Sequence, residues 1–233
     1  MQETIRNNID RVLEKAAKAA QRAGRDPKDI TLIAVSKMHP AEDVEAAAKC
    51  GVLDFGENKV QELLSKQPLV EIPVRWHLIG HLQTNKVRQA VGKVVLIHSV
   101  DSMHLAEEID KRSAAAGIVS DILIQVNAAQ EESKFGVGLN EAEALALQAA
   151  EEFKNIRIRG LMEIAPYAED PEEVRIYFRQ VAKLYEELKS AGITSMDTLS
   201  MGMSGDFETA IEEGSTHIRV GTAIFGERDY NKK

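Results

Sequence analysis

A short β-like run followed by a helical segment recurs eight times along this chain of 233 residues, and this repeat limits the possible folds more than any other feature. The β-like runs are rich in apolar residues, whereas the helical segments repeat apolar residues at intervals of three and four. The β-like runs are Thr31–Ser36, Val52–Gly56, Val74–Ile79, Val94–Ser99, Asp121–Val126, Ile156–Leu161, Met196–Ser200 and Thr216–Val220. The helical segments include Ala41–Lys49, Asn58–Lys66, Ser102–Ala116, Glu141–Glu152 and Glu172–Ser190.

Strands that alternate with helices form parallel sheets, and eight such units predict an α/β fold, a single (β/α)8 TIM-type barrel. A doubly wound sheet is the competing architecture. It would have to hold eight parallel strands, and the chain has no G-x-G-x-x-G after its first strand. Residues 1–24 predict an extra N-terminal helix that packs on the barrel, because Ile5, Ile9 and Val12 share one face. No linker or low-complexity tract interrupts the chain, so residues 1–233 are expected to form one domain.

Charge and composition argue against several classes of protein. The net charge is −8 and no basic cluster is present, so nucleic acid is not an expected partner. Cys50 is the only cysteine, which rules out an internal disulfide and fits a reducing cytosol. The N-terminus has no apolar signal core, and no apolar run reaches the length of a membrane span. We therefore expect a soluble, cytoplasmic protein, and a lone barrel without an evident apolar patch is expected to be a monomer.

The first predicted strand runs directly into Lys37, at the end of the barrel where this fold places its chemistry. Ile33, Val35 and Lys37 alternate along the strand, so Lys37 faces the barrel interior if Val35 does. A lysine there can be a Schiff-base nucleophile when its amine is partly desolvated or held near other cations. It can equally be an ordinary exposed lysine, and the residue alone does not decide between these interpretations.

Polar residues after the second, third and fourth strands have both structural and functional interpretations. Asn58 can cap the next helix or form a hydrogen bond with a bound ring. His77 and His81 are spaced like a helical metal pair, but a glycine lies between them in a strand-plus-turn segment and no third ligand is evident. We therefore expect polar residues at a pocket mouth there rather than a metal site. Asp101 is expected to cap a helix.

Two charged residues follow the fifth and sixth strands. Lys134 is a second lysine candidate, although it lies in a loop beyond its strand. Glu163 is either a carboxylate near the pocket or an exposed side chain. The sequence leaves both roles open.

The last two strands end in small residues that favour anion binding. Leu199–Asp206 reads L-S-M-G-M-S-G-D and opens a helix, and the eighth strand ends in Arg219–Thr222. Small side chains let backbone N–H groups approach an anion, a helix N-terminus adds a favourable field, and Ser200 and Ser204 supply hydroxyl donors. The loops after strands seven and eight form the recurrent phosphate site of this barrel, so we expect a phosphate there. Arg219 can point inward, where it needs a carboxylate or a ligand ring nitrogen as its partner.

A strand-end lysine, a phosphate site and an inward arginine together fit pyridoxal 5′-phosphate. Its aldehyde would join Lys37, its phosphate would occupy the loops near Ser204, and Arg219 would face its pyridine nitrogen. An arginine stays protonated and cannot readily keep that nitrogen protonated, so the ring is a weaker electron sink. A barrel acting on sugar phosphates is the other possibility; it would use the same phosphate site but give Lys37 no preferred aldehyde.

Seven motifs carry a family resemblance that spans nearly the whole chain in order. They are Ala34–Lys37, Phe55–Asn58 with Gln61 and Glu62, His77–Gln83 with Asn85 and Lys86, His98–Asp101, Lys134–Gly136, Leu199–Asp206 and Arg219–Gly226. With these motifs the chain resembles the pyridoxal phosphate homeostasis protein family, also described as YggS-like or PROSC-like proteins. That family is similar to the barrel domain of bacterial alanine racemase, which has fold type III among the proteins that use this cofactor.

The resemblance implies a role for each motif residue. It implies that Lys37 carries pyridoxal phosphate as a Schiff base and that Arg219 meets the pyridine nitrogen. The residues that it implies for the phosphate are Ser204, Gly205, Gly221 and Thr222. It also implies three further pocket residues, namely Asn58, His81 and Ser200. Glu163 departs from the family pattern, in which a smaller or neutral residue is common.

A carrier and an enzyme both remain compatible with this resemblance. A carrier would hold the reactive aldehyde, limit free cofactor and supply it to apoenzymes, whereas the alternative is a weak amino-acid racemase. A two-base racemase needs a second acid or base opposite the lysine, and in alanine racemase a tyrosine from a second domain supplies it. This chain ends at Lys233, with no residues for that domain, and among Tyr167, Tyr177, Tyr185 and Tyr230 only Tyr167 follows a strand end. We therefore expect a carrier.

Overall fold

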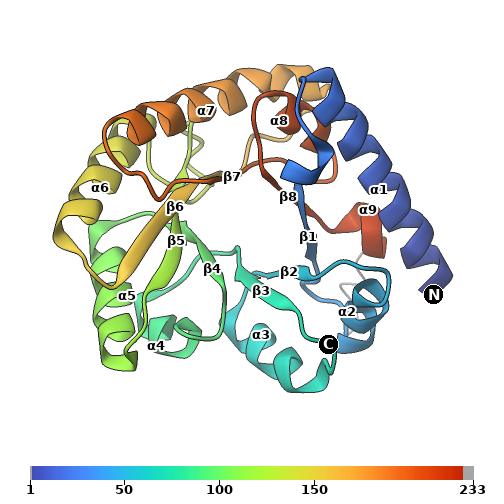
Figure 1. Cartoon of the computed structure of the whole chain (residues 1–233), viewed down its shortest axis with the longest axis horizontal. Helices are drawn as coiled ribbons and strands as arrows, with labels where there is room; N and C mark the ends of the chain where they lie inside the picture. Colours follow the sequence, from blue (N-terminus) through green and yellow to red (C-terminus); the bar gives the residue numbers. More distant parts are fainter. Residues whose placement is uncertain (1, 228–233) are drawn as a thin grey trace.

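Eight parallel strands form a closed barrel in the computed structural model, which describes residues 2–227. The strands follow one another around the barrel in chain order, and β8 pairs with β1 to close it (Figure 1). They are β1 (Thr31–Val35), β2 (Asp54–Glu57), β3 (Arg75–Leu78), β4 (Leu96–Val100), β5 (Ser120–Val126), β6 (Ile156–Glu163), β7 (Thr198–Ser200) and β8 (His217–Val220). The predicted (β/α)8 barrel is confirmed, and the doubly wound sheet is ruled out because such a sheet keeps two open edges.

The helices form an outer ring around the strands (Figure 1). They are α1 (Gln2–Arg22), α2 (Ala41–Ala48), α3 (Val60–Lys66), α4 (Val87–Ala90), α5 (Met103–Ala116), α6 (Leu139–Glu152), α7 (Arg175–Ser190), α8 (Phe207–Glu212) and α9 (Thr222–Phe225). Short 3-10 turns lie at Pro27–Asp29, Gln67–Leu69, Thr84–Lys86 and Pro171–Val174. None of the helices between residues 2 and 227 combines the length and the apolar character needed to cross a membrane.

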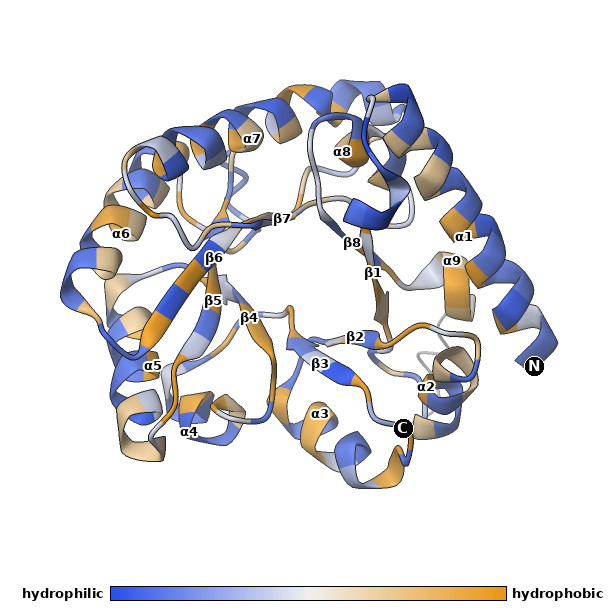
Figure 2. Cartoon of the chain, in the orientation of Figure 1, coloured by the Kyte–Doolittle hydropathy of each residue, from blue (hydrophilic) through white to orange (hydrophobic). Residues whose placement is uncertain are grey.

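The extra helix α1 covers the part of the barrel where the eighth repeat is short. Its buried face, which includes Ile5, Ile9 and Val12, packs against α2, α8 and α9. Because α9 is a single turn of four residues, it cannot cover β8 and β1 by itself. Figure 1 shows α1 running along the outside at this place, and Figure 2 shows it as alternating hydrophilic and hydrophobic bands, the pattern of a helix with one buried face.

Alternation along the strands separates an apolar outer layer from a largely polar barrel interior. On β3, Trp76 and Leu78 belong to the clusters between strands and helices, whereas His77 points to the other side of the strand. Leu96, Leu123 and Met162 form a small separate apolar cluster on the inner side. The barrel interior therefore holds buried polar groups that require partners or a function.

Two helix starts differ from the sequence prediction. Helix α3 begins at Val60 with Lys59 in the N-cap position, so Asn58 is not a helix cap. Helix α5 is capped by Ser102, whose hydroxyl accepts a hydrogen bond from the Leu105 backbone at 3.3 Å, so the predicted cap at Asp101 is also wrong. In both cases the strand ends one residue later than predicted, which moves the cap along the chain.

Candidate functional site

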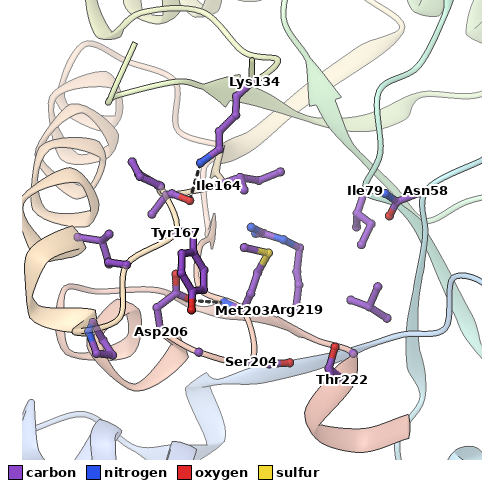
Figure 3. Close-up of a pocket in the computed structure, with 18 of the residues that line it drawn as sticks. Asn58, Ile79, Lys134, Ile164, Tyr167, Met203, Ser204, Asp206, Arg219 and Thr222 are labelled. Atoms are coloured by element: carbon purple, nitrogen blue, oxygen red, sulfur yellow. Dashed lines mark hydrogen bonds between the residues drawn. The ribbon is translucent and has the colours of Figure 1, made fainter. Parts of the chain in front are cut away.

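A cavity of about 460 Å³ opens at the C-terminal ends of the strands. Seven of the nine residues that the sequence indicated lie in its wall: Lys37, Asn58, Ser204, Gly205, Arg219, Gly221 and Thr222. Figure 3 shows that its side chains come from opposite sides of the barrel, with Asn58 and Ile79 facing Lys134 and Tyr167 across the cavity. Closure of the barrel thus brings the first and last repeats together around one space.

Lys37 lies in the turn after β1 and is partly buried. Val35 and Lys37 both line the cavity, as the alternation predicted. The next residue, Met38, has a φ of 65°, which is uncommon for a residue other than glycine. The backbone at Lys37 is therefore held in a tight and specific turn.

A buried ion cluster that the sequence did not reveal fixes this turn. The Lys66 ammonium donates to the Ser36 carbonyl at 2.7 Å, to Glu57 at 2.7 Å and to Glu62 at 2.6 Å. The Ser36 hydroxyl also donates to Glu57 at 2.7 Å, and Glu62 accepts from the Met38 backbone N–H. Both neighbours of Lys37 are thus tied to α3 and β2. Burial raises the pKa of Glu57, and the nearby Lys66 ammonium opposes that rise.

Asn58 reaches the cavity because Gly80 leaves space beside its backbone. A Cβ atom at Gly80 would lie 2.4 Å from the Asn58 carbonyl oxygen, which is closer than a non-bonded contact allows. The glycine in the His77–His81 segment therefore lets the β2 and β3 ends approach each other. Asn58, freed from capping, presents an amide to the cavity.

Two small-residue loops, which follow β7 and β8, form the wall next to the end of β1. Gly202 has a φ of 87°, and a Cβ there would lie 2.7 Å from Ala210, so this turn requires glycine. The Ser204 hydroxyl accepts a hydrogen bond from the Ala223 backbone at 3.3 Å, which joins the loops after β7 and β8. Nothing lies within 4 Å of a Cβ placed on Gly205, so the backbone there faces open space. This geometry leaves room for an anion beside backbone N–H groups and hydroxyls.

Arg219 lies beneath the cavity, and 3% of its surface is exposed. Its guanidinium donates to the Ser200 hydroxyl at 2.6 Å and to the Glu163 carbonyl at 2.6 Å. Burial lowers its pKa to about 10, against the opposing influence of Asp206 and Glu163, so it remains a cation at neutral pH. A held cation of this kind can donate to an acceptor atom on a ligand.

Burial raises the pKa of two carboxyl groups near Arg219. Glu163 is fully buried, and neither carboxyl oxygen forms a hydrogen bond with any residue in the described part of the chain. Burial raises its pKa to about 8, although the nearby Ala128 backbone and the charges of Arg219 and Lys134 oppose this. Burial also raises the pKa of Asp206, which accepts from the Met203 backbone at 2.6 Å. Of the two roles that the sequence left open, Glu163 is therefore not the exposed side chain, and it lies near the cavity beside Arg219 without lining it.

The structure does not place His81 and Ser200, the other two predicted residues, in the cavity wall. His81 stacks on Phe135, with 4.0 Å between ring centroids, and faces a neighbouring groove. Ser200 is fully buried between His98 and Arg219, so it contacts the guanidinium and not the cavity. Ser200 faces the barrel interior, as Arg219 does. It lies one layer of side chains farther from the cavity, because it pairs with His217, two residues before Arg219 on β8.

Two further candidates from the sequence do reach the cavity. Lys134 lines it, but its ammonium donates to the Ala165 carbonyl at 2.9 Å and pairs with Glu131 at 2.8 Å (Figure 3). Tyr167 lines the mouth and is 91% exposed. Tyr230 lies outside the described residues. Between residues 2 and 227 no three His, Cys, Asp or Glu side chains are grouped in a way that would hold a metal.

The arrangement suits a small phosphorylated carbonyl compound with an acceptor atom in its ring. The cavity offers a lysine amine, a loop pair open to an anion, and a buried arginine donor, which are the three groups such a molecule needs. The apolar part of the wall, such as Val35, Ile79 and Met203, can contact a flat ring.

Comparison with known proteins gives a consistent result. Residues 4–229 match the family described as alanine racemase, N-terminal domain. The chain is 48% identical over 223 residues to the pyridoxal phosphate homeostasis protein of Aquifex aeolicus, covering 95% of this chain and 97% of that one. It is 42% identical over 234 residues to the protein of the same name from Escherichia coli, covering 98% and 99% of the two chains.

Solved structures agree with this match. The structure of PipY from Synechococcus elongatus with PLP bound superposes with a TM-score of 0.80 at 38% identity, over 91% of this chain and 100% of that one. An alanine racemase from Clostridium difficile superposes with a TM-score of 0.74 at 14% identity, over 98% of this chain and 58% of that one, which shows the shared barrel alone. The chain belongs to the pyridoxal phosphate homeostasis protein family.

Proposed function

We propose that this chain binds pyridoxal 5′-phosphate in the cavity at the C-terminal ends of its strands and serves vitamin B6 homeostasis. One observation carries the proposal: the cavity wall combines Lys37, the loops at Ser204 and Thr222, and Arg219. The names of the relatives and the PLP-bound neighbour support the same ligand.

Each wall residue has a role in this proposal. Lys37 would hold the ligand as a Schiff base, since its amine can add to the aldehyde with loss of water. Ser204, Gly205, Gly221 and Thr222 hold the phosphate, and Asn58 contacts the edge of the ring. Arg219 donates to the pyridine nitrogen. Ser200 acts through Arg219, and His81 borders the mouth through its contact with Phe135.

We favour a carrier over an efficient enzyme. The bound cofactor can act as an electron sink for amino-acid chemistry, but this is strongest when the ring nitrogen is protonated. Arg219 has no proton to give up at neutral pH, since its pKa is about 10 and a guanidinium only donates hydrogen bonds. The carrier would act as a monomer in the cytoplasm and supply the cofactor to apoenzymes.

A weak racemase is the second candidate, and one residue favours it. Tyr167 lines the mouth of the cavity, where a phenol could serve as a second acid or base. Its 91% exposure leaves that hydroxyl in solvent and without the fixed geometry that proton transfer needs.

Chemical trapping tests the central claim. Pyridoxal phosphate is added to the purified protein, the complex is reduced with borohydride, and the labelled peptide is identified by mass spectrometry. We expect the label on Lys37, and we expect Lys37→Ala to lose both the label and the imine absorbance. Lys134→Ala is the matched control, because that lysine lines the same cavity, and it should keep both. Full occupancy with an unchanged spectrum in Lys37→Ala would overturn the proposal.

Isotope exchange separates the carrier from the racemase. The loaded protein is incubated with L-alanine in deuterated water, and exchange at Cα and formation of D-alanine are followed. The carrier predicts neither on the timescale of minutes. Rapid exchange that Tyr167→Phe abolishes would establish the enzyme instead.

A further inference from the structure

Five buried polar side chains form a continuous hydrogen-bonded chain across the barrel interior. Its members are Asp54, His77, His98, Ser200 and Arg219, from β2, β3, β4, β7 and β8, and none is more than 6% exposed. Asp54 to His77 Nε2, His77 Nδ1 to His98 Nε2, and His98 Nδ1 to the Ser200 hydroxyl each measure 3.0 Å. Arg219 Nη1 lies 2.6 Å from the same hydroxyl. The chain leads from a second cavity, lined by Asp54 and His77, to the candidate cofactor cavity, lined by Arg219.

The chemistry of the two end groups determines the direction in which the hydrogen bonds are donated. A guanidinium has only N–H donors, so the Ser200 oxygen accepts from Arg219. At the other end, burial raises the pKa of Asp54, but its hydrogen bonds with His77 and Arg75 outweigh burial and bring the pKa to about 2. Asp54 is therefore a carboxylate at neutral pH and can only accept.

The Ser200 hydroxyl hydrogen then has one acceptor among its partners. Within residues 2–227 its hydroxyl has two hydrogen-bond partners, Arg219 and His98 Nδ1. Because it already accepts from the arginine, it donates to His98 Nδ1. His98 is consequently neutral with its hydrogen on Nε2, in agreement with burial, which lowers the pKa of this imidazole well below 6.5. His98 donates to His77 Nδ1, and His77 donates its Nε2 hydrogen to Asp54.

We propose that this ordered chain is a positioning device for Arg219, which runs through a serine and two neutral histidines and ends on the Asp54 carboxylate as its final acceptor. Every hydrogen points from Arg219 toward Asp54, so the bond dipoles add and each bond strengthens the next. Nη1 is held by Ser200 and Nη2 by the Glu163 carbonyl, which fixes the plane of the guanidinium below the cavity.

A competing arrangement makes a different and measurable prediction. His77 could be an imidazolium that pairs with Asp54 and donates Nδ1–H to His98, and His98 would then donate Nδ1–H to Ser200. In that case Ser200 accepts twice, and its own buried hydrogen has no partner among residues 2–227. A buried donor without a partner is costly, which favours the chain of neutral histidines.

Nitrogen NMR of the histidine rings in the ligand-free protein decides between the two. The protein is labelled with ¹⁵N-histidine, and the His77 and His98 rings are assigned with His77→Gln and His98→Gln and measured at pH 7. We expect both rings to be neutral with the hydrogen on Nε2. A doubly protonated His77, or a hydrogen on Nδ1 of His98, would overturn the proposal.

A matched pair of serine variants tests whether the chain positions Arg219. Ser200→Ala breaks it, whereas Ser99→Ala removes a fully buried hydroxyl, without a hydrogen-bond partner among the described residues, from the strand of His98. We expect Ser200→Ala to alter the His98 ring signals and to weaken pyridoxal phosphate binding about fivefold, the worth of about one hydrogen bond. Ser99→Ala should change neither. Ring signals and affinity that stay unchanged in Ser200→Ala would contradict the positioning role. If the wild-type protein does not bind pyridoxal phosphate, the proposed function fails, but the ring signals still test the chain.

Discussion

At the N-terminal ends of the strands the carboxylates of the second cavity have arginine partners, whereas at the C-terminal ends Glu163 has none. Asp54 pairs with Arg75, Asp121 with Arg157 and Arg159, and Asp197 with Arg159. Both Glu163 carboxyl oxygens, in contrast, lack a hydrogen bond to any described residue. We call these two regions the floor and the mouth of the barrel.

This difference shows that paired charges stabilise the floor, whereas the candidate reactive groups lie at the mouth. Floor charges satisfy one another, so that cavity needs no ligand to account for its residues. The mouth holds a lysine in a constrained turn, a neutralised carboxyl and open backbone at Gly205. Carboxyl groups with a raised pKa and open backbone are typical of sites that bind a ligand.

The largest effect is expected at the cluster that holds the turn of Lys37. Lys66→Met leaves Glu57 and Glu62 without their shared cation, and removing one partner of a buried ion pair costs about 3 to 5 kcal/mol. Urea unfolding measures the loss. Lys49→Met is the control, because its ion pair with Glu45 is more than half exposed on the lysine side and should cost under about 1 kcal/mol. Equal losses in the two variants would contradict the role of the cluster.

At the mouth, Glu163→Gln should stabilise the protein, whereas Lys66→Met destabilises it. The folded pKa of about 8 lies above the unfolded value, so the native state prefers the protonated carboxyl, and stability falls as the pH rises through this range. The variant lacks this loss and should gain on the order of 3 kcal/mol over the wild type between pH 4 and pH 8. Thermal unfolding across that range measures the difference. A constant difference between the two proteins would show that the carboxyl does not titrate there.

Lowering the pH should destabilise the floor, because Asp54 becomes protonated there. The Asp54 pKa of about 2 lies below the unfolded value of about 4, so its contribution is complete above pH 4 and is lost as the pH falls through 2. We expect Asp54→Asn to destabilise the protein by about 2 kcal/mol at pH 7, and the difference from the wild type to disappear near pH 2. Urea midpoints at the two pH values check this. A difference that persists at pH 2 would point to packing rather than charge.

The smallest effect is expected at the outer edge of the floor. The Arg157 side chain is 53% exposed where it pairs with Asp121. Arg157→Gln should therefore cost under about 1 kcal/mol, and the cost should shrink in high salt. Chemical unfolding at low and high ionic strength measures both. A cost comparable to that of Lys66→Met would erase the distinction between buried and exposed charge on which the comparison depends.

Periodicity in the sequence was sufficient to predict the barrel. Runs with alternating or continuous apolar residues and helices with a period near four can be recognised locally, and eight repeats leave few architectures. The strand-end positions of Lys37 and Arg219 and the small residues near Ser204 and Thr222 followed from the same repeat, because the barrel gathers its C-terminal strand ends at one face.

Caps and partners were not predictable in this way. The sequence predicts Asn58 as a possible cap, yet α3 begins two residues later, and the close approach of Gly80 leaves Asn58 facing the cavity. The family resemblance implies that Ser200 is a pocket residue, yet it lies behind Arg219. Ser200 and Arg219 both face the barrel interior, but their relative depth depends on the register between β7 and β8, which sequence patterns do not fix.

The sequence by itself determined the repeat, the fold and the chemical types of the residues at the strand ends. Only the tertiary structure decided which of them meet. His98 and Ser200 are separated by 102 positions in the chain, and their hydrogen bond exists because β8 closes on β1 and brings the inner faces of distant strands together. Local composition encodes periodicity, whereas such contacts depend on the register of every strand between them, which no short segment contains.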